Sequence, residues 1–95
     1  MADKPMLRII VYDIGSDRRR RKVADTLEAR AARVQESVFE SRLTHRQANR
    51  LMSDLQRLAG PGDSIRLYTV PDGLLPRCAE QGGPAIDGGG RFWLL

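Results

Sequence analysis

The sequence contains a single cysteine and a single histidine among its 95 residues. Cys78 therefore has no partner for a disulfide bond within the chain, and an oxidising compartment is not indicated. A zinc finger needs about four cysteine and histidine ligands, which one chain of this composition does not supply. Small disulfide-stabilised proteins and zinc fingers are therefore excluded.

Aromatic residues and long apolar runs are also scarce. Aromatic residues make up 5% of the chain, and the paired aromatics of an RNA-recognition sheet are not evident. No segment approaches the roughly 20 consecutive apolar residues of a membrane span, and no signal peptide is visible. We expect a cytoplasmic protein with no membrane contact.

Positive charge is in excess, with a formal net charge of +4. This balance favours nucleic acid as a partner. Lys4 and Lys22 are the only lysines, so most of the positive charge is carried by arginine, whose planar guanidinium suits bidentate contacts with phosphate. A chain of this length forms one domain with a modest core, which favours further burial against a partner chain.

The hydrophobic pattern predicts alternating strands and helices. In chain order these are a strand at 7–12 buried on both faces, a helix at about 18–30, an extended segment at 33–43, a helix between Thr44 and Gly60, a strand at 64–70 and a terminal strand at about 91–95. The extended segment is either one long bent strand or two short strands broken near Glu36 and Ser37. Thr44 and Gln47 form a capping box. The order predicts one α+β domain over residues 1–95, a ferredoxin-like βαββαβ fold with an additional C-terminal strand.

The first predicted strand ends at Asp13, a short turn away from a basic helix start. Ends of strands followed by loops are where binding sites are usually built. Asp13 is either a metal ligand or general base, or an aspartate that caps the helix or forms the turn. One carboxylate makes a poor Mg²⁺ site, whereas a two-fold dimer would bring a second Asp13 to a shared site.

Five consecutive cations open the first predicted helix: Arg18, Arg19, Arg20, Arg21 and Lys22. They are either a solvated helix start or a phosphate-binding element. Cations at a helix N-terminus oppose the helix dipole at a cost of about 0.3–1 kcal/mol each, and helix N-termini attract phosphate. The run therefore favours binding of the nucleic-acid backbone, without evident base specificity.

The remaining candidates have structural alternatives. Tyr12 and Phe39 fit a core or rim position better than base stacking, and Ser37 either positions a phosphate or is structural. The chain end is strongly apolar, which is unusual for a frayed terminus. It is expected to pair as an edge strand, on its own sheet or on a partner's, through Phe92, Trp93, Leu94 and Leu95.

Two motifs, together with the basic helix start between them, resemble the small CRISPR-associated adaptation proteins of the Cas2 family, which are partners of the CRISPR integrase. The motifs are Ile10–Ile14 and Arg33–Glu40, and the resemblance covers about residues 7–71. It implies a ferredoxin-like homodimer whose C-terminal strands contribute to pairing. It also implies metal-dependent endonuclease activity on RNA or double-stranded DNA, and a dimer that bridges two integrase dimers and holds the new spacer DNA.

The resemblance also implies roles for single residues. Asp13 matches the catalytic Mg²⁺ ligand, and basic positions match Arg20 and, less closely, Lys22. The matches in the second motif are Arg33, Ser37 and Phe39, which together with the basic run are the expected nucleic-acid contacts. Glu36 departs from the family pattern, because relatives often carry an aromatic or apolar residue there.

These observations predict a dimeric scaffold that binds double-stranded DNA for the integrase in spacer acquisition. The resemblance leaves open a Mg²⁺-dependent endonuclease activity, with the ion shared between two Asp13 carboxylates. Two alternatives remain: a stand-alone RNA-cleaving toxin with the same fold, and a non-catalytic module that binds single-stranded RNA by stacking bases on Phe39 or Tyr12.

Overall fold

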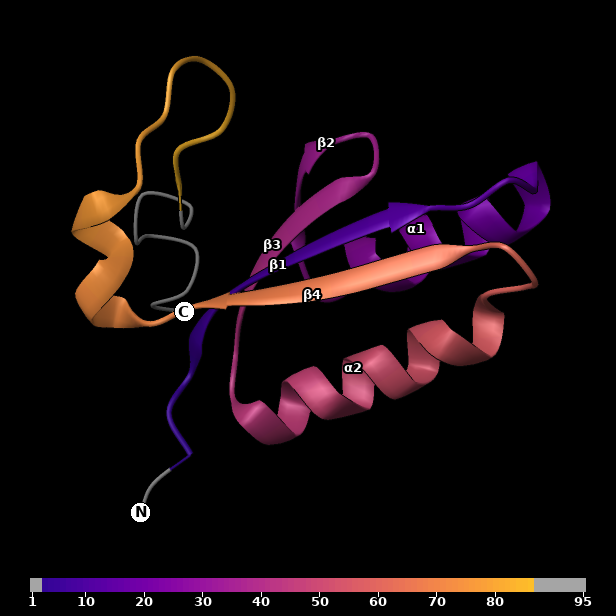
Figure 1. Cartoon of the computed structure of the whole chain (residues 1–95), viewed down its shortest axis with the longest axis horizontal. Helices are drawn as coiled ribbons and strands as arrows, with labels where there is room; N and C mark the ends of the chain where they lie inside the picture. Colours follow the sequence, from indigo (N-terminus) through magenta and orange to yellow (C-terminus); the bar gives the residue numbers. More distant parts are fainter. Residues whose placement is uncertain (1–2, 87–95) are drawn as a thin grey trace.

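The computed structural model describes residues 3–86, so the predicted strand at 91–95 and its dimer contacts lie outside the described residues. The elements are β1 (Met6–Asp13), α1 (Asp17–Glu28), β2 (Ala32–Gln35), β3 (Val38–Leu43), α2 (His45–Leu58), β4 (Ser64–Val70) and the 3₁₀ helix η1 (Asp72–Arg77). The strands form one antiparallel sheet in the order β2-β3-β1-β4. Both helices pack on one face of this sheet (Figure 1), which confirms the ferredoxin-like prediction.

The core lies between the sheet and the two helices, because alternate strand residues point toward the helices. Its buried members are Ile10, Tyr12, Ile14, Val23, Leu27, Phe39, Leu51 and Leu55. On the opposite face Leu7 is buried but Ile9 and Val11 are only half-buried, so the prediction that this strand is buried on both faces is wrong for them. The reason is that both α-helices cover the other face of this antiparallel sheet, while on this face residues 78–86 border the end near Leu7 and Ile9.

The side of the sheet away from α1 and α2, here called the open face, is defined by Ile9, Val11, Val38 and Tyr68. Val11 pairs with Val38 and Ile9 pairs with Tyr68 across neighbouring strands, so the four side chains share one side of the sheet. Tyr68 is the most exposed of them, with 49% of its surface accessible. The open face therefore carries a group of apolar side chains in the middle of the sheet, beside Glu40 and Arg66, which pair with Ile9 and Val11.

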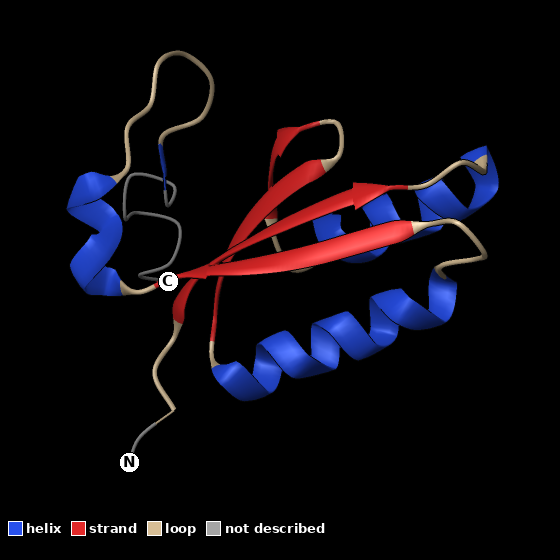
Figure 2. Cartoon of the chain, viewed as in Figure 1, coloured by secondary structure: helices blue, strands red, loops and turns tan. Residues whose placement is uncertain are grey.

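Figure 2 shows the helices and strands of the chain, and a local side-chain cap sets the start of α1 and of α2. Ser16 caps α1, because its Oγ accepts a hydrogen bond from the Arg19 amide at 3.2 Å. The predicted capping box of α2 is confirmed: Thr44 Oγ1 accepts from the Gln47 amide at 3.1 Å, and the Thr44 amide donates to Gln47 Oε1 at 2.9 Å. Within residues 3–86, neither helix combines the length and apolar character needed to cross a membrane.

The extended segment at 33–43 forms two strands, which confirms the second of the two alternatives. The turn between β2 and β3 lies beside the end of β1, because the Tyr12 amide donates to the Ser37 carbonyl at 3.1 Å. The Tyr12 hydroxyl donates to the Glu36 carbonyl at 2.9 Å. These two bonds hold the turn against the strand end that carries Asp13.

Candidate nucleic-acid interface

A shallow cavity of about 180 Å³ lies where β1 ends, and we call it the Asp13 cavity. Its lining residues are Tyr12, Asp13, Ile14, Arg20, Glu36 and Ser37. They come from the end of β1, the first turn of α1 and the β2–β3 turn. The fold therefore brings together three residues expected from the sequence to form a site: Asp13, Arg20 and Ser37.

Asp13 is exposed at the last position of β1, opposite Ser64 of β4. The helix-capping interpretation of Asp13 is wrong, since Ser16 caps α1. Within residues 3–86 the Asp13 carboxylate has no hydrogen bond or ion pair. Asp13 is therefore free to bind a ligand.

Glu36 also lines the Asp13 cavity and was not expected to be part of the site. The sequence feature that could have indicated Glu36 as a site residue is its position next to Ser37, at the break between the two strands. Carboxylate oxygens are the donors that Mg²⁺ prefers, but the ion takes about six oxygen ligands. No group of three acidic, histidine or cysteine residues that could hold a metal occurs in the part of the chain that the structure describes. The donor type thus fits Mg²⁺, while one chain leaves the site incomplete.

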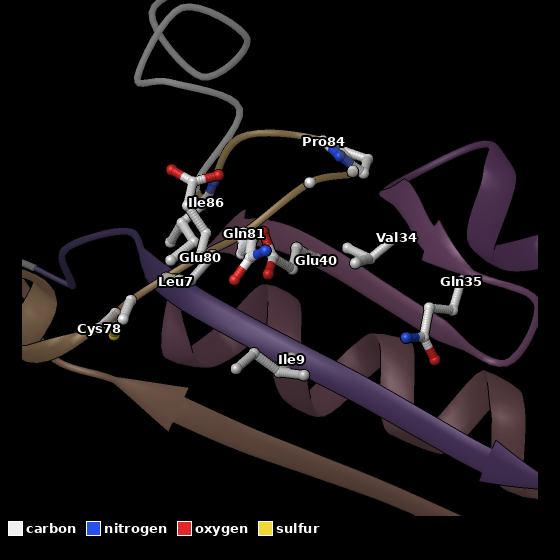
Figure 3. Close-up of a pocket in the computed structure, with 13 residues that line it drawn as sticks. Leu7, Ile9, Val34, Gln35, Glu40, Cys78, Glu80, Gln81, Pro84 and Ile86 are labelled. Atoms are coloured by element: carbon white, nitrogen blue, oxygen red, sulfur yellow. The ribbon is translucent and has the colours of Figure 1, made fainter.

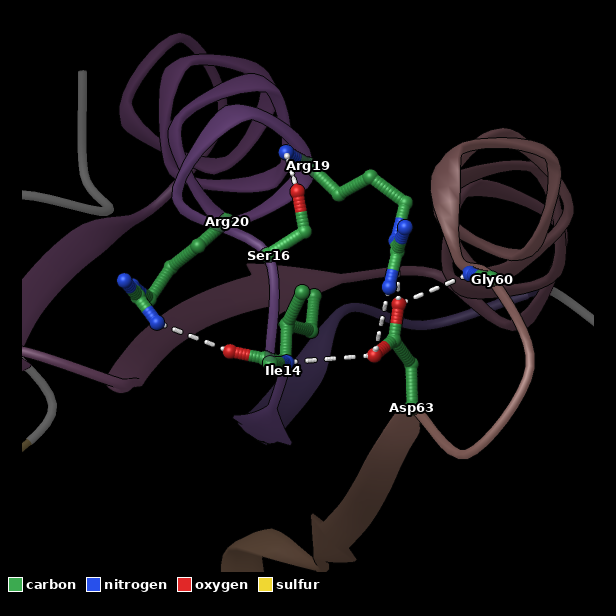
Figure 4. Close-up of polar contacts among 7 residues, drawn as sticks. Ile14, Ser16, Arg19, Arg20, Gly60 and Asp63 are labelled. Atoms are coloured by element: carbon green, nitrogen blue, oxygen red, sulfur yellow. Dashed lines mark hydrogen bonds and ion pairs between the residues drawn. The ribbon is translucent and has the colours of Figure 1, made fainter.

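The basic run of α1 divides into two groups. Arg19 and Arg20 turn toward the protein: Arg19 Nε donates to Asp63 Oδ2 at 2.8 Å, and Arg20 Nη1 donates to the Ile14 carbonyl at 2.8 Å (Figure 4). Arg20 also forms an ion pair with Asp17. These contacts tie both side chains to the loops around the Asp13 cavity.

The other group is the α1 basic face, which consists of Arg18, Arg21 and Lys22. Arg21 and Lys22 follow Arg18 by three and four positions, so the three residues lie on the same side of the helix. All are exposed, and none has an ion pair or side-chain hydrogen bond within residues 3–86. Their charges are therefore available for phosphate.

Arg33 is held by the protein itself. Its guanidinium lies 4.8 Å from the centre of the Phe39 ring, a cation–π contact. Nη1 donates to the Glu36 carbonyl at 2.6 Å, and Nη2 donates to Glu28 at 2.6 Å. The hydrogen bond to Glu28 raises the pKa of Arg33. In this conformation Arg33 supports the β2–β3 turn that borders the Asp13 cavity.

The expected nucleic-acid contact of Phe39 is wrong, because this side chain has an accessibility of 0%. Tyr12 is 4% accessible, and the two rings stack with their centres 6.2 Å apart. Burial raises the pKa of the Tyr12 hydroxyl. The core interpretation of both rings is therefore confirmed, and the single-stranded RNA module that stacks bases on them has no exposed ring to use.

Asp63 was not expected to matter for the site. Its carboxylate accepts hydrogen bonds from the Arg19 side chain and from the amides of Gly60 and Gly15 (Figure 4). The bonds from Arg19 and Gly60 lower its pKa from 3.8 to about 2. The sequence shows only an aspartate at the end of a glycine-containing loop, so its partners depend on the fold.

A larger cavity, of about 680 Å³, lies on the other end of β1 (Figure 3). It is lined by Leu7 and Ile9 of the sheet and by residues from 78 to 86. The charged residues among its lining are Glu40 and Glu80, both acidic. This cavity therefore does not suit nucleic acid, and the interface is better placed at the Asp13 end.

Comparisons with known proteins agree on one family. A family model described as CRISPR associated protein Cas2 matches residues 6–75. A Synechocystis protein named CRISPR-associated endoribonuclease Cas2 3 is 40% identical over 81 residues, which covers 84% of this chain and 88% of that protein. A Thermus thermophilus protein named CRISPR-associated endonuclease Cas2 2 is 42% identical over 62 residues, covering 64% and 69%. The crystal structure of hypothetical protein TT1823 from Thermus thermophilus matches with a TM-score of 0.72 and 34% identity, covering 85% of this chain and 96% of that one.

Proposed function

This chain belongs to the CRISPR-associated Cas2 family, and we propose that it acts as a dimeric scaffold that binds double-stranded DNA for the CRISPR integrase during spacer acquisition. The observation that carries this proposal is the α1 basic face, on the same helix whose Arg20 lines the Asp13 cavity. Three exposed cations without protein partners in the described chain are suited to the phosphate backbone. Backbone contacts of this kind need no particular base sequence, as a scaffold for varied spacer DNA requires.

The dimer is supported by the open face and by the incomplete Asp13 cavity. Strand alternation places Asp13 on the same side of β1 as Ile9 and Val11. A second copy that packs on the open face would cover these half-buried apolar side chains and bring its own Asp13 to the same side. Two-fold pairing thus supplies both the missing burial and the missing carboxylate.

A second activity, hydrolysis of phosphodiester bonds, is favoured by the free Asp13 carboxylate and by the names of the relatives. Asp13 from each copy would hold Mg²⁺, which when bound would neutralise phosphate charge and acidify a bound water. The α1 basic face would bind the backbone, and the Ser37 hydroxyl would donate a hydrogen bond to a phosphate oxygen. Arg20 would keep the Ile14 carbonyl and the cavity wall in place.

Neutralising the α1 basic face tests the scaffold. We expect the triple variant Arg18→Gln, Arg21→Gln, Lys22→Gln to lose duplex affinity. The slope of log K against log salt should become shallower by about 0.9 for each lost phosphate contact. The matched control is the triple change of Arg46, Arg50 and Arg57 to Gln, which removes the same charge from α2. Equal losses in both variants would contradict a specific role for the α1 basic face.

The variant Asp13→Asn separates the two activities. We expect it to bind duplex DNA and support spacer integration by the integrase as the parent does, because the phosphate contacts lie on α1. Metal-dependent cleavage should fall at least about 100-fold, the scale of removing a group that acts on the reacting phosphate. Cleavage that survives the change would refute the proposed role of Asp13 in hydrolysis, and failed integration would refute a scaffold that is independent of it.

A further inference from the structure

The Asp63 carboxylate is almost completely enclosed and uses both of its oxygens. Oδ2 accepts from Arg19 Nε at 2.8 Å and from the Gly60 amide at 2.7 Å. Oδ1 accepts from Arg19 Nη2 at 3.3 Å and from the Gly15 amide at 3.2 Å. The side chain of Asp63 is 2% accessible. This carboxylate therefore has four donors from three separate parts of the chain.

The three parts meet around the Asp63 carboxylate (Figure 4). Gly15 lies two residues after Asp13, Arg19 lies in the first turn of α1, and Gly60 follows the end of α2. Asp63 itself directly precedes Ser64, which pairs with Asp13 across the sheet. Asp63 thus connects the loop that follows Asp13 to the start of β4.

Gly60 leaves the space that the Arg19 side chain occupies. A Cβ atom at position 60 would lie 2.7 Å from both Cζ and Nε of Arg19, closer than side-chain atoms approach in proteins. The guanidinium therefore packs directly against a residue that has no side chain. Arg19 is held by this contact as well as by its two bonds to Asp63.

We propose that Arg19 and Asp63 form a clasp that positions the β1–α1 loop, which directly follows Asp13, and that Arg19 is for this reason not a nucleic-acid contact. The proposal rests on the proposed function, because it separates the residues that bind DNA from those that hold the loop. The α1 basic face binds the DNA backbone, whereas the clasp holds the β1–α1 loop in place. Moving Arg19 to a phosphate would leave an enclosed carboxylate without its strongest donor. Within residues 3–86, its neighbours Arg18 and Arg21 have no such partner to leave.

The first test compares Arg19→Gln with Arg21→Gln, which remove the same charge from the same helix. We expect Arg21→Gln to make the salt dependence of duplex binding shallower by about 0.9 in log K against log salt, as for one lost phosphate contact. Arg19→Gln should leave that slope unchanged. A change in slope with Arg19→Gln as large as that with Arg21→Gln would overturn the proposal.

The second test needs no DNA and so distinguishes the clasp from the proposed function. We expect Arg19→Gln to speed hydrogen exchange of the Gly15 amide by about three- to tenfold, as expected from loss of charge-assisted hydrogen bonds. The Ile10 amide in the core reports global unfolding, so its exchange measures any loss of overall stability separately from opening of the β1–α1 loop. Arg21→Gln should leave both amides as in the parent.

Gly60→Ala tests the same clasp without altering any charge. The added methyl group should displace the Arg19 guanidinium and speed exchange of the Gly15 amide as Arg19→Gln does. Unchanged Gly15 exchange in both variants would overturn the clasp, even if the α1 basic face proves to bind DNA. Absence of duplex binding together with faster Gly15 exchange would refute the proposed function and support the clasp.

Discussion

Asp63 is a residue whose charge the folded state stabilises. Its pKa is lowered from 3.8 to about 2, first by the Arg19 hydrogen bond and then by the Gly60 amide. The unfolded chain therefore takes up a proton at higher pH than the folded protein. The resulting stabilisation is complete above about pH 4, and it is lost as the pH falls through about 2.

We therefore expect the free energy of unfolding of the Asp63→Asn variant to decrease less than that of the parent when the pH is lowered from about 4 to 2. The free energy of unfolding, measured with urea at several pH values, should change less with pH in this variant than in the parent. The matched control is Asp25→Asn, on the exposed side of α1, where the carboxylate has no ion pair within residues 3–86. An equal pH dependence in Asp63→Asn and the parent would contradict the prediction.

At the scale of elements, the start of α2 combines local and distant caps. The side chains of Thr44 and Gln47 each accept a hydrogen bond from the other residue's backbone amide. Asp3 accepts hydrogen bonds from the amides of His45 at 2.8 Å and Arg46 at 3.1 Å. These amide bonds lower the pKa of Asp3. A carboxylate at this end also interacts favourably with the helix dipole. The start of α2 is therefore held to the segment that precedes β1.

Removing the local cap should have a measurable cost. We expect Thr44→Ala to lower the free energy of unfolding by about 0.5–2 kcal/mol, because the Gln47 amide loses its acceptor. Urea denaturation measures this change, and the m-value should remain that of the parent. Ser53→Ala, an exposed change inside α2, is the control and should cost less. A Thr44→Ala variant as stable as the control would show that Asp3 alone is sufficient to cap the helix.

At the scale of the whole molecule, α1 and α2 pack on the same face of the sheet (Figure 1). The core between sheet and helices is small, and the open face leaves Ile9, Val11 and Val38 half-buried. A domain of this size gains much from additional burial against a second chain. The open face and the single Asp13 carboxylate lie on the same side of β1. One two-fold contact would therefore complete both the packing and the proposed site.

We expect the parent protein to have twice the 10.6 kDa chain mass in light scattering at micromolar concentration. Tyr68→Lys should shift the equilibrium toward the monomer, because it places two like charges in a small contact. Tyr68 is half-exposed in one chain, so its replacement should not disturb the core. Ser53→Lys on α2 is the control. A monomeric parent, or a dimer unaffected by Tyr68→Lys, would contradict pairing through the open face.

The elements and much of the site were predictable from short-range patterns. The apolar spacing predicted both helices, although α1 ends at Glu28 rather than near residue 30. The residues of the Asp13 cavity were expected in part, because Asp13, Arg20 and Ser37 stand in recognisable motifs. Glu36 was not expected there, since its role depends on the β2–β3 turn packing against β1.

The sequence by itself determined what depends on neighbours in the chain: the helix caps, the apolar periodicity, the order of the elements and the excess of arginine. The tertiary structure decided which arginines are available. Arg19 and Arg21 are alike in sequence, but Asp63, 44 residues after Arg19, pairs with the first and leaves the second exposed. The physical reason is that a hydrogen bond requires two groups at about 3 Å, and for residues far apart in sequence only the folded chain sets that distance.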